Sequence, residues 1–320
     1  MNNQELIEWL LRGDVSIQYQ VYRDLLDAER PDLRMRIATE GWGARFLSKR
    51  NTNGHWGKRF YEPKWTSTHY TLLDLRNLEI SPDHPLIRET IDRILKEEKS
   101  PDGGIHPISM ENKSDVCVNG MFLNYASYFR ADQEQLKSII DFLLAEQMDD
   151  GGFNCMSNRS GAIHSSMHST LSVLEGLTEY ELNGYYYRMH EIDEVRRAAI
   201  EFLLLHRLYL SDQTGKIINP DFIKLTYPCR WRYDILRALD YFRHADVLWD
   251  ERMGPAVEVL WKKRNKNMTW NTQAKHPGQV HFDMEESGKP SRWNTLRALR
   301  VLKHFKIMEG ELVEDLAIQN

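Results

Sequence analysis

Side chains that can do chemistry gather where helical segments begin after a series of glycine-rich turns. Imidazole and thiol groups ligate metal ions, guanidinium groups bind anions, and tryptophan ring faces stabilise cations or stack on sugars. Serine, aspartate and proline at such starts are explained by helix capping, but these other side chains are not. The candidate site residues are Trp65, His69, Cys117, His164, His168, Cys229, Arg230, Trp231, Arg292 and Trp293.

The turns recur about every 50 residues, which is the period of a repeat architecture. They occupy residues 53–57, 101–105 and 149–153, and weaker versions occupy 214–217 and 268–270. A repeat of this kind buries its apolar face only by stacking on its neighbours. The site is therefore expected where the repeats converge.

The segments around the turns are helical and of two kinds. Amphipathic segments precede the turns, at 86–95, 136–144, 195–205 and 256–261. Segments that are apolar over more of their circumference follow them, at 65–78, 115–129, 168–180, 231–242 and 293–305, and these are expected to be inner helices. Segments 4–11, 16–26 and 33–47 complete six αα-hairpins, and strand signals are nearly absent. We predict an all-α fold, an (α/α)6 barrel or toroid, with an open superhelix of the same hairpins as the alternative.

Composition limits the class of protein. The repeat runs through all 320 residues without a linker, so residues 1–320 are expected to form one domain. No apolar run approaches the roughly 18 residues of a membrane span, and the N-terminus lacks the pattern of a secretory signal. Three cysteines without a CxxC pair suit a reducing compartment. Together these features predict a cytoplasmic protein. A net charge of -5 without a basic stripe argues against nucleic acid as a partner.

The third turn carries a family resemblance. Residues 145–153, with Gln147 before Gly151, Gly152 and Phe153, resemble the repeat of squalene-hopene cyclases and protein prenyltransferase beta subunits. That terpenoid cyclase and prenyltransferase superfamily implies an (α/α)6 barrel whose central cavity binds a hydrophobic, isoprenoid-like small molecule. Its prenyltransferase branch also implies a helical partner subunit.

The resemblance to prenyltransferase beta subunits extends to a metal motif. It implies Asp115, Cys117 and His168 as zinc ligands, because residues 115–117 read Asp-x-Cys and residues 168–177 are similar to the stretch that holds the family's histidine. One carboxylate, one thiolate and one imidazole suit a catalytic Zn²⁺ with an open fourth position. Two side chains that are two residues apart in a helix point about 200° from each other. Asp115 and Cys117 can therefore bind one metal ion only if Asp115 lies at the N-cap or in the loop before the helix. The alternative is that Asp115 is an ordinary N-cap, Cys117 a small buried residue and His168 a hydrogen-bonded core histidine.

The sequence also departs from both branches. It has no Asp-x-Asp-Asp motif of a cyclase, and Lys113 is the one cation in the stretch before Asp115, where a diphosphate needs several donors. We therefore predict a zinc-dependent, prenyltransferase-like or cyclase-like enzyme, with two alternatives. One is a carbohydrate-active (α/α)6 barrel, which needs two facing carboxylates or a Tyr or His base. The other is a non-catalytic toroid that binds a lipid or a protein partner.

Overall fold

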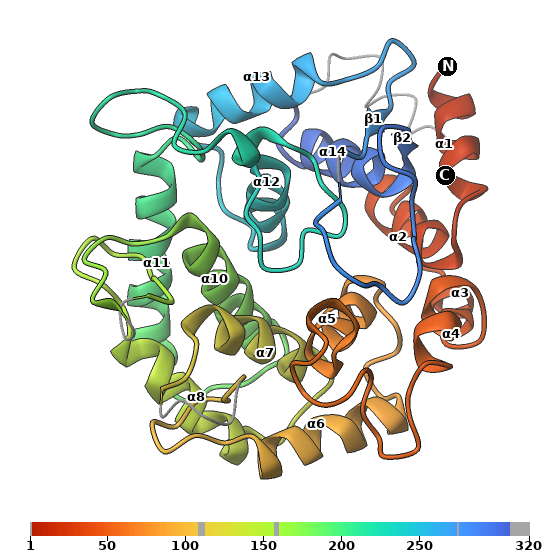
Figure 1. Ribbon diagram of the computed structural model, residues 1–320. Helices are drawn as coiled ribbons and strands as arrows, with labels where there is room; N and C mark the ends of the chain where they lie inside the picture. The colour runs from red at the N-terminus through yellow and green to blue at the C-terminus, as the bar shows by residue number, and fades with distance from the viewer. Residues whose placement is uncertain (1, 108–112, 157–159, 274, 308–320) are drawn as a thin grey trace.

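The chain folds into two concentric rings of helices, seen end-on in Figure 1. This computed structural model describes residues 2–107, 113–156, 160–273 and 275–307. The inner ring is formed by α2 (Val15–Leu25), α5 (Thr68–Asn77), α7 (Val116–Tyr128), α10 (Met167–Leu182), α12 (Ile235–His244) and α14 (Arg292–His304). The outer ring is formed by α1 (Asn3–Leu11), α3 (Pro31–Arg36), α4 (Gly41–Leu47), α6 (Pro85–Glu97), α8 (Gln133–Ala145), α11 (Met189–Leu205) and α13 (Gly254–Lys262).

Short elements fill some of the connections. Three 3-10 turns lie at η1 (Lys64–Thr66), η2 (Pro220–Ile223) and η3 (Glu251–Met253). The two-residue strands β1 (Trp270–Asn271) and β2 (Pro290–Ser291) pair in antiparallel fashion before α14. The predicted all-α fold is confirmed.

The inner ring is closed, which decides between the barrel and the open superhelix. The last inner helix, α14, packs against both α12 and the first inner helix, α2. At this junction the Arg300 guanidinium donates to Gln20 Oε1 and Asp24 Oδ2 of α2, both at 2.9 Å. The first and sixth hairpins therefore meet as neighbours, and the structure is an (α/α)6 barrel.

The repeated turns share one backbone geometry. In four of the turns, the amide of the first residue donates to the carbonyl of the fifth residue. The carbonyl of the first residue accepts a hydrogen bond from the amide of the fourth. The fourth residue has a positive φ, which glycine adopts without strain. This residue is Gly54, Gly103 or Gly151 in the first three turns, with φ values of +82°, +93° and +89°. Met268 takes the same place at +63°, which explains why the last turn looked weak as a sequence motif.

Each of these turns is anchored to the inner helix that follows it. The amides of Trp56, Phe153 and Trp270 each donate to a threonine Oγ1 in the first turn of the next helix, at 2.9–3.0 Å. Their rings are completely buried. The turn thus fixes where the inner helix begins, and so fixes the end of the barrel at which those beginnings meet.

Two segments differ from the predicted helices. The outer segment 33–47 is split into α3 and α4, because Gly41 adopts a φ of +60° and the Asp14 carboxylate accepts the Trp42 amide at 2.7 Å. The fifth inner helix begins at Ile235 rather than at 231, because Asp234 caps it by accepting the Arg237 amide at 2.9 Å. None of the described helices combines the length and apolar character needed to cross a membrane.

The connection between β1 and β2 reaches across the barrel to α5. The Trp65 indole donates to the Pro277 carbonyl at 2.7 Å, and His281 Nε2 lies 3.0 Å from Thr71 Oγ1. Phe282 packs against Phe46 with ring centroids 4.6 Å apart. This connection therefore covers part of the end at which the inner helices begin.

Candidate active site

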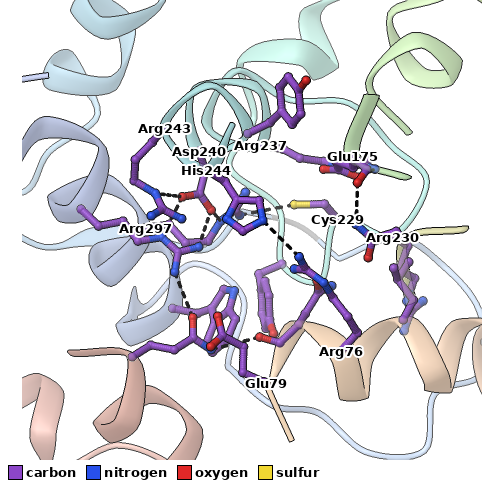
Figure 2. A pocket seen from close by; sticks show the side chains of 18 residues that line it. Arg76, Glu79, Glu175, Cys229, Arg230, Arg237, Asp240, Arg243, His244 and Arg297 are labelled. Atoms are coloured by element: carbon purple, nitrogen blue, oxygen red, sulfur yellow. Dashed lines mark hydrogen bonds and ion pairs between the residues drawn. The ribbon is translucent and has the colours of Figure 1, made fainter. Parts of the chain in front are cut away.

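All six inner helices contribute to one central cavity of about 100 Å³. Figure 2 shows the side chains that point into it. The lining consists of Gln20, Leu73, Arg76, Asn77, Glu79, Asn124, Glu175, Tyr227, Cys229, Arg230, Arg237, Asp240, Tyr241, Arg243, His244, Trp293, Arg297 and Arg300. Six of these residues are arginines and three are acidic, so the charges of the lining favour an anion over an apolar chain.

A cluster around Asp240 holds three of the arginines in place. Its carboxylate accepts from Arg243 Nε at 3.1 Å, from Arg297 Nε at 3.1 Å and from Arg300 Nε at 2.7 Å. Burial alone raises the pKa of a carboxyl, but these guanidinium groups, Arg300 most of all, hold the pKa of Asp240 well below its usual range. This cluster joins α12 to α14 and is part of the barrel's framework.

Two more arginines also have carboxylate partners. Arg237 binds Glu175 of α10 through two nitrogens, at 2.9 and 2.6 Å. Arg76 of α5 pairs with Glu179, which His244 also contacts at 3.2 Å. Five of the six arginines thus have a carboxylate partner, which leaves Arg230.

Arg230 is a buried cation without a partner. It is 7% exposed, and among the described residues its guanidinium group makes no hydrogen bond or ion pair. The group lies over the Trp65 ring, 4.4 Å from its centre. The backbone of Arg230 has a φ of +56°, a conformation that costs a non-glycine residue free energy. A buried guanidinium without a hydrogen-bonded partner is suited to bind a carboxylate or phosphate group.

Arg230 and Tyr227 also line a second, smaller pocket of about 30 Å³ at the mouth of the barrel. This mouth pocket contains the carboxyl groups of Asp74 and Glu285. Glu285 accepts from the Trp293 amide at 3.0 Å and from the Ser291 hydroxyl, so it is tied to the start of α14. The central cavity and the mouth pocket thus share residues and form one candidate site.

Asp74 has the properties of a proton-transfer group. It is 4% exposed, and its side chain accepts no hydrogen bond from the described part of the chain. Burial raises its pKa from 3.8 to about 6, and the charge of Arg230 offsets this only in part. A buried carboxyl group with a raised pKa that lines a pocket is a candidate catalytic acid or base.

The three predicted zinc ligands are not brought together. His168 Nδ1 accepts the Tyr233 amide at 2.7 Å, and its ring packs edge-on against Phe222 and Trp231. Asp115 is the N-cap of α7, and Cys117 lies in the first turn of that helix. No three His, Cys, Asp or Glu side chains within the described ranges are placed to hold a metal ion. The zinc prediction thus gains no support from this geometry.

The other predicted site residues divide into two groups. Trp65, Cys229, Arg230 and Trp293 line the central cavity or the mouth pocket. The remaining four do not line either: His69, His164, Trp231 and Arg292.

Each of those four has another setting. His69 is completely buried against Tyr125, with Nδ1 and the phenol oxygen 3.1 Å apart, and burial lowers its pKa to about 3. His164 is exposed, and Trp231 packs against His168. Arg292 donates to the Trp9 carbonyl at 2.9 Å, between α14 and α1. These residues are structural or peripheral to the site.

The charged residues inside the barrel were not predicted from the sequence. A signal for them exists, because residues three apart share a helix face, and α12 carries Arg237, Asp240 and Arg243 at this spacing. The pair Arg297 and Arg300 repeats it in α14. Charges spaced this way on otherwise apolar inner helices indicate a polar cavity.

Comparisons with known proteins support the fold. No protein-family model and no curated protein matches the chain. Among solved structures, a polysaccharide lyase matches at 13% identity over 94% of this chain and 96% of its own, with a TM-score of 0.52. A glycosyl hydrolase of family 88 from Bacteroides vulgatus matches at 12% identity over 94% and 98%, with a TM-score of 0.49.

A type II terpene cyclase from Scytonema, solved with geranylgeranyl dihydroxybenzoate, matches at 13% identity over 92% of this chain and 88% of its own, with a TM-score of 0.45. The terpene cyclase is thus among the similar structures, and no activity follows from the match. At 13% identity the likeness to the polysaccharide lyase shows the fold alone.

Proposed function

We propose that this protein is a carbohydrate-active enzyme that cleaves a glycosidic bond next to a terminal acidic sugar. The observation that carries the proposal is the juxtaposition of Arg230 and Asp74, an unpaired buried cation and a carboxyl with a pKa of about 6, in one connected site. Arg230 binds the carboxylate of the sugar. Asp74 donates a proton to the departing glycosidic oxygen.

The surroundings of this pair support the proposal. Trp65 and Trp293 supply ring faces, and Glu285 places a second carboxyl group in the mouth pocket. Glycosidases use two carboxyl groups around the scissile bond. The toroid shared with a polysaccharide lyase agrees with this choice of class.

Charge favours an acidic sugar over the isoprenoid ligand. A long apolar chain in the central cavity would have to lie against buried arginines, which costs free energy, whereas a carboxylate gives Arg230 a partner. Zinc and an isoprenoid substrate remain untested predictions.

A matched pair of disaccharides tests the function. One carries a terminal glucuronate and the other a terminal glucose, so the two differ in a carboxylate against a hydroxymethyl group. We expect release of the second sugar from the glucuronate compound and at least about tenfold less from the glucose compound, because Arg230 gains a charged partner only from the first. Cleavage of both at equal rates, or of neither across a panel of linkages, would contradict the proposal.

A further inference from the structure

Another pocket, of about 220 Å³, adjoins the mouth pocket. We call it the outer pocket, and its charged lining consists of Asp221, Lys224, Arg232, Asp234 and Lys275. Lys275 and His276 line the mouth pocket as well. The mouth pocket in turn shares Arg230 with the central cavity. The three pockets therefore follow one another along a single path that starts inside the barrel, and Asp74 lies in the middle one.

Arg232 is the cation of the outer pocket with the weakest pairing. Among the described residues its guanidinium group donates no hydrogen bond, and its Nε is buried. Its ion pair with the Asp221 carboxylate is long, with nitrogen and oxygen 3.8 Å apart, whereas Lys224 binds that carboxylate at 2.6 Å. The other acid of the lining, Asp234, caps α12 instead. The hydrogen-bonding capacity of Arg232 is thus unused.

A row of alternating cations and indole rings connects Arg230 with Arg232. The Arg230 guanidinium lies 4.4 Å from the centre of the Trp65 ring, and the Lys64 ammonium lies 5.0 Å from the same ring. Lys64 also lies 5.2 Å from the centre of the Trp231 ring, and Arg232 lies 5.0 Å from that ring. Ring faces attract these cations without neutralising their charge. The row therefore keeps positive charge between the central cavity and the outer pocket.

We propose that the outer pocket binds a second acidic sugar, so that the substrate carries a uronate on each side of the cleaved bond. This inference rests on the proposed function. Arg230 holds the carboxylate of the terminal sugar, Asp74 faces the bond from the mouth pocket, and Arg232 holds the carboxylate of the next sugar. A guanidinium group without a hydrogen-bonded partner can bind a carboxylate through two parallel hydrogen bonds, which a neutral sugar does not offer.

Two non-cleavable, sulfur-linked disaccharides test this inference by isothermal titration of the full-length protein. Both carry a terminal glucuronate, and the second unit is glucuronate in one compound and glucose in the other. We expect the wild-type protein to bind the compound with two glucuronates at least about tenfold more tightly, because only its second carboxylate gives Arg232 a partner. In Arg232→Met this preference should disappear, while the affinity for the compound with glucose should stay close to the wild-type value.

Two further variants serve as a test of opposite sign and as a control. Asp221→Asn should increase the preference for the second glucuronate, because it removes a negative charge beside Arg232. Arg264→Met is the matched control. Arg264 also lies over an indole ring, 4.4 Å from the centre of Trp261, but it lines none of the three pockets. This variant should leave both affinities unchanged.

The outcomes separate this inference from the proposed function. Equal affinity of the wild type for the two compounds, or a preference that survives in Arg232→Met, overturns the second acidic subsite and leaves the proposed function standing. Binding of neither compound to the wild type overturns both. The wild-type preference and its increase in Asp221→Asn are measured independently of whether Arg232→Met folds.

Discussion

Replacing Asp74 by asparagine is expected to lower turnover of the acidic saccharide by about 10²–10⁴-fold, the usual contribution of a positioned acid or base. Asparagine has nearly the same shape but no proton to donate. In the wild-type protein, turnover should fall as the pH rises through about 6, because the donor must be protonated. Initial rates between pH 4 and 8 measure both effects.

The same substitution should make the fold more stable at pH 8. The pKa of Asp74 is 3.8 when exposed and about 6 in the folded protein, so the folded state binds its proton more tightly. Such a carboxyl has no effect on stability below pH 4 and destabilises the fold as the pH rises from about 4 to about 6. At 1.36 kcal/mol per pKa unit, the free energy of unfolding should rise by about 3 kcal/mol in Asp74→Asn above pH 6.

Stability and activity together give Asp74 a distinct signature. A variant of a purely structural residue would lose activity because its fold is less stable. The Asp74→Asn variant, in contrast, should lose activity although its fold is more stable than that of the wild type. Asp83→Asn removes an exposed ion pair with Arg130 and serves as the control, with little change in either quantity. Full activity in Asp74→Asn, or a less stable variant at pH 8, would remove Asp74 from the proposed mechanism.

Replacing Asp240 by asparagine is expected to lower the free energy of unfolding by about 3–5 kcal/mol. The reason is that Arg243, Arg297 and Arg300 would remain buried without their shared carboxylate. Urea denaturation should show a lower midpoint with an unchanged slope, since the surface exposed on unfolding stays the same. A loss below about 1 kcal/mol would mean that the cluster does not hold the ring together.

The acid side of the stability curve provides an independent check on these buried pairs. The pKa values of Asp24 and Glu179 are lowered to about 2, since Arg300 and Arg76 respectively overcome the effect of burial. A carboxyl with a lowered folded pKa contributes stability above its unfolded pKa, near 4, and loses it as the pH falls toward 2. The free energy of unfolding of the wild-type protein should therefore fall steeply as the pH falls from about 4 to about 2.

The sequence allowed most of the helical framework to be predicted, because the turn recurs with a glycine at the left-handed position, as at Gly54, Gly103 and Gly151. Closure of the ring could not be predicted, since it depends on the small rotation between neighbouring hairpins. It is visible only in long-range contacts such as that between Arg300 and Asp24.

The site was predicted in part, for reasons that individual residues make clear. Arg230 was found because capping does not explain an arginine at that place, but its missing partner is a property of the folded interior. Asp74 lies mid-helix among apolar residues, and its raised pKa arises from burial that no local pattern encodes. The Tyr233 amide donates to Nδ1 of His168, a contact that the zinc motif does not predict. The spacing of a sequence motif does not determine which neighbouring group forms a hydrogen bond with its histidine.

Isothermal titration of a non-cleavable, sulfur-linked analogue of the glucuronate-terminated disaccharide into the wild-type protein and into Arg230→Met tests the central claim most directly. Removing one partner of a buried, charge-assisted pair costs about 2–5 kcal/mol, so affinity should fall about 30-fold or more in Arg230→Met. The variant should still fold, because among the described residues Arg230 has its contact with the Trp65 ring to lose but no hydrogen bond or ion pair. Equal affinity of the two proteins, or equal affinity of the wild type for the glucose-terminated disaccharide, would contradict an anion-binding site at Arg230.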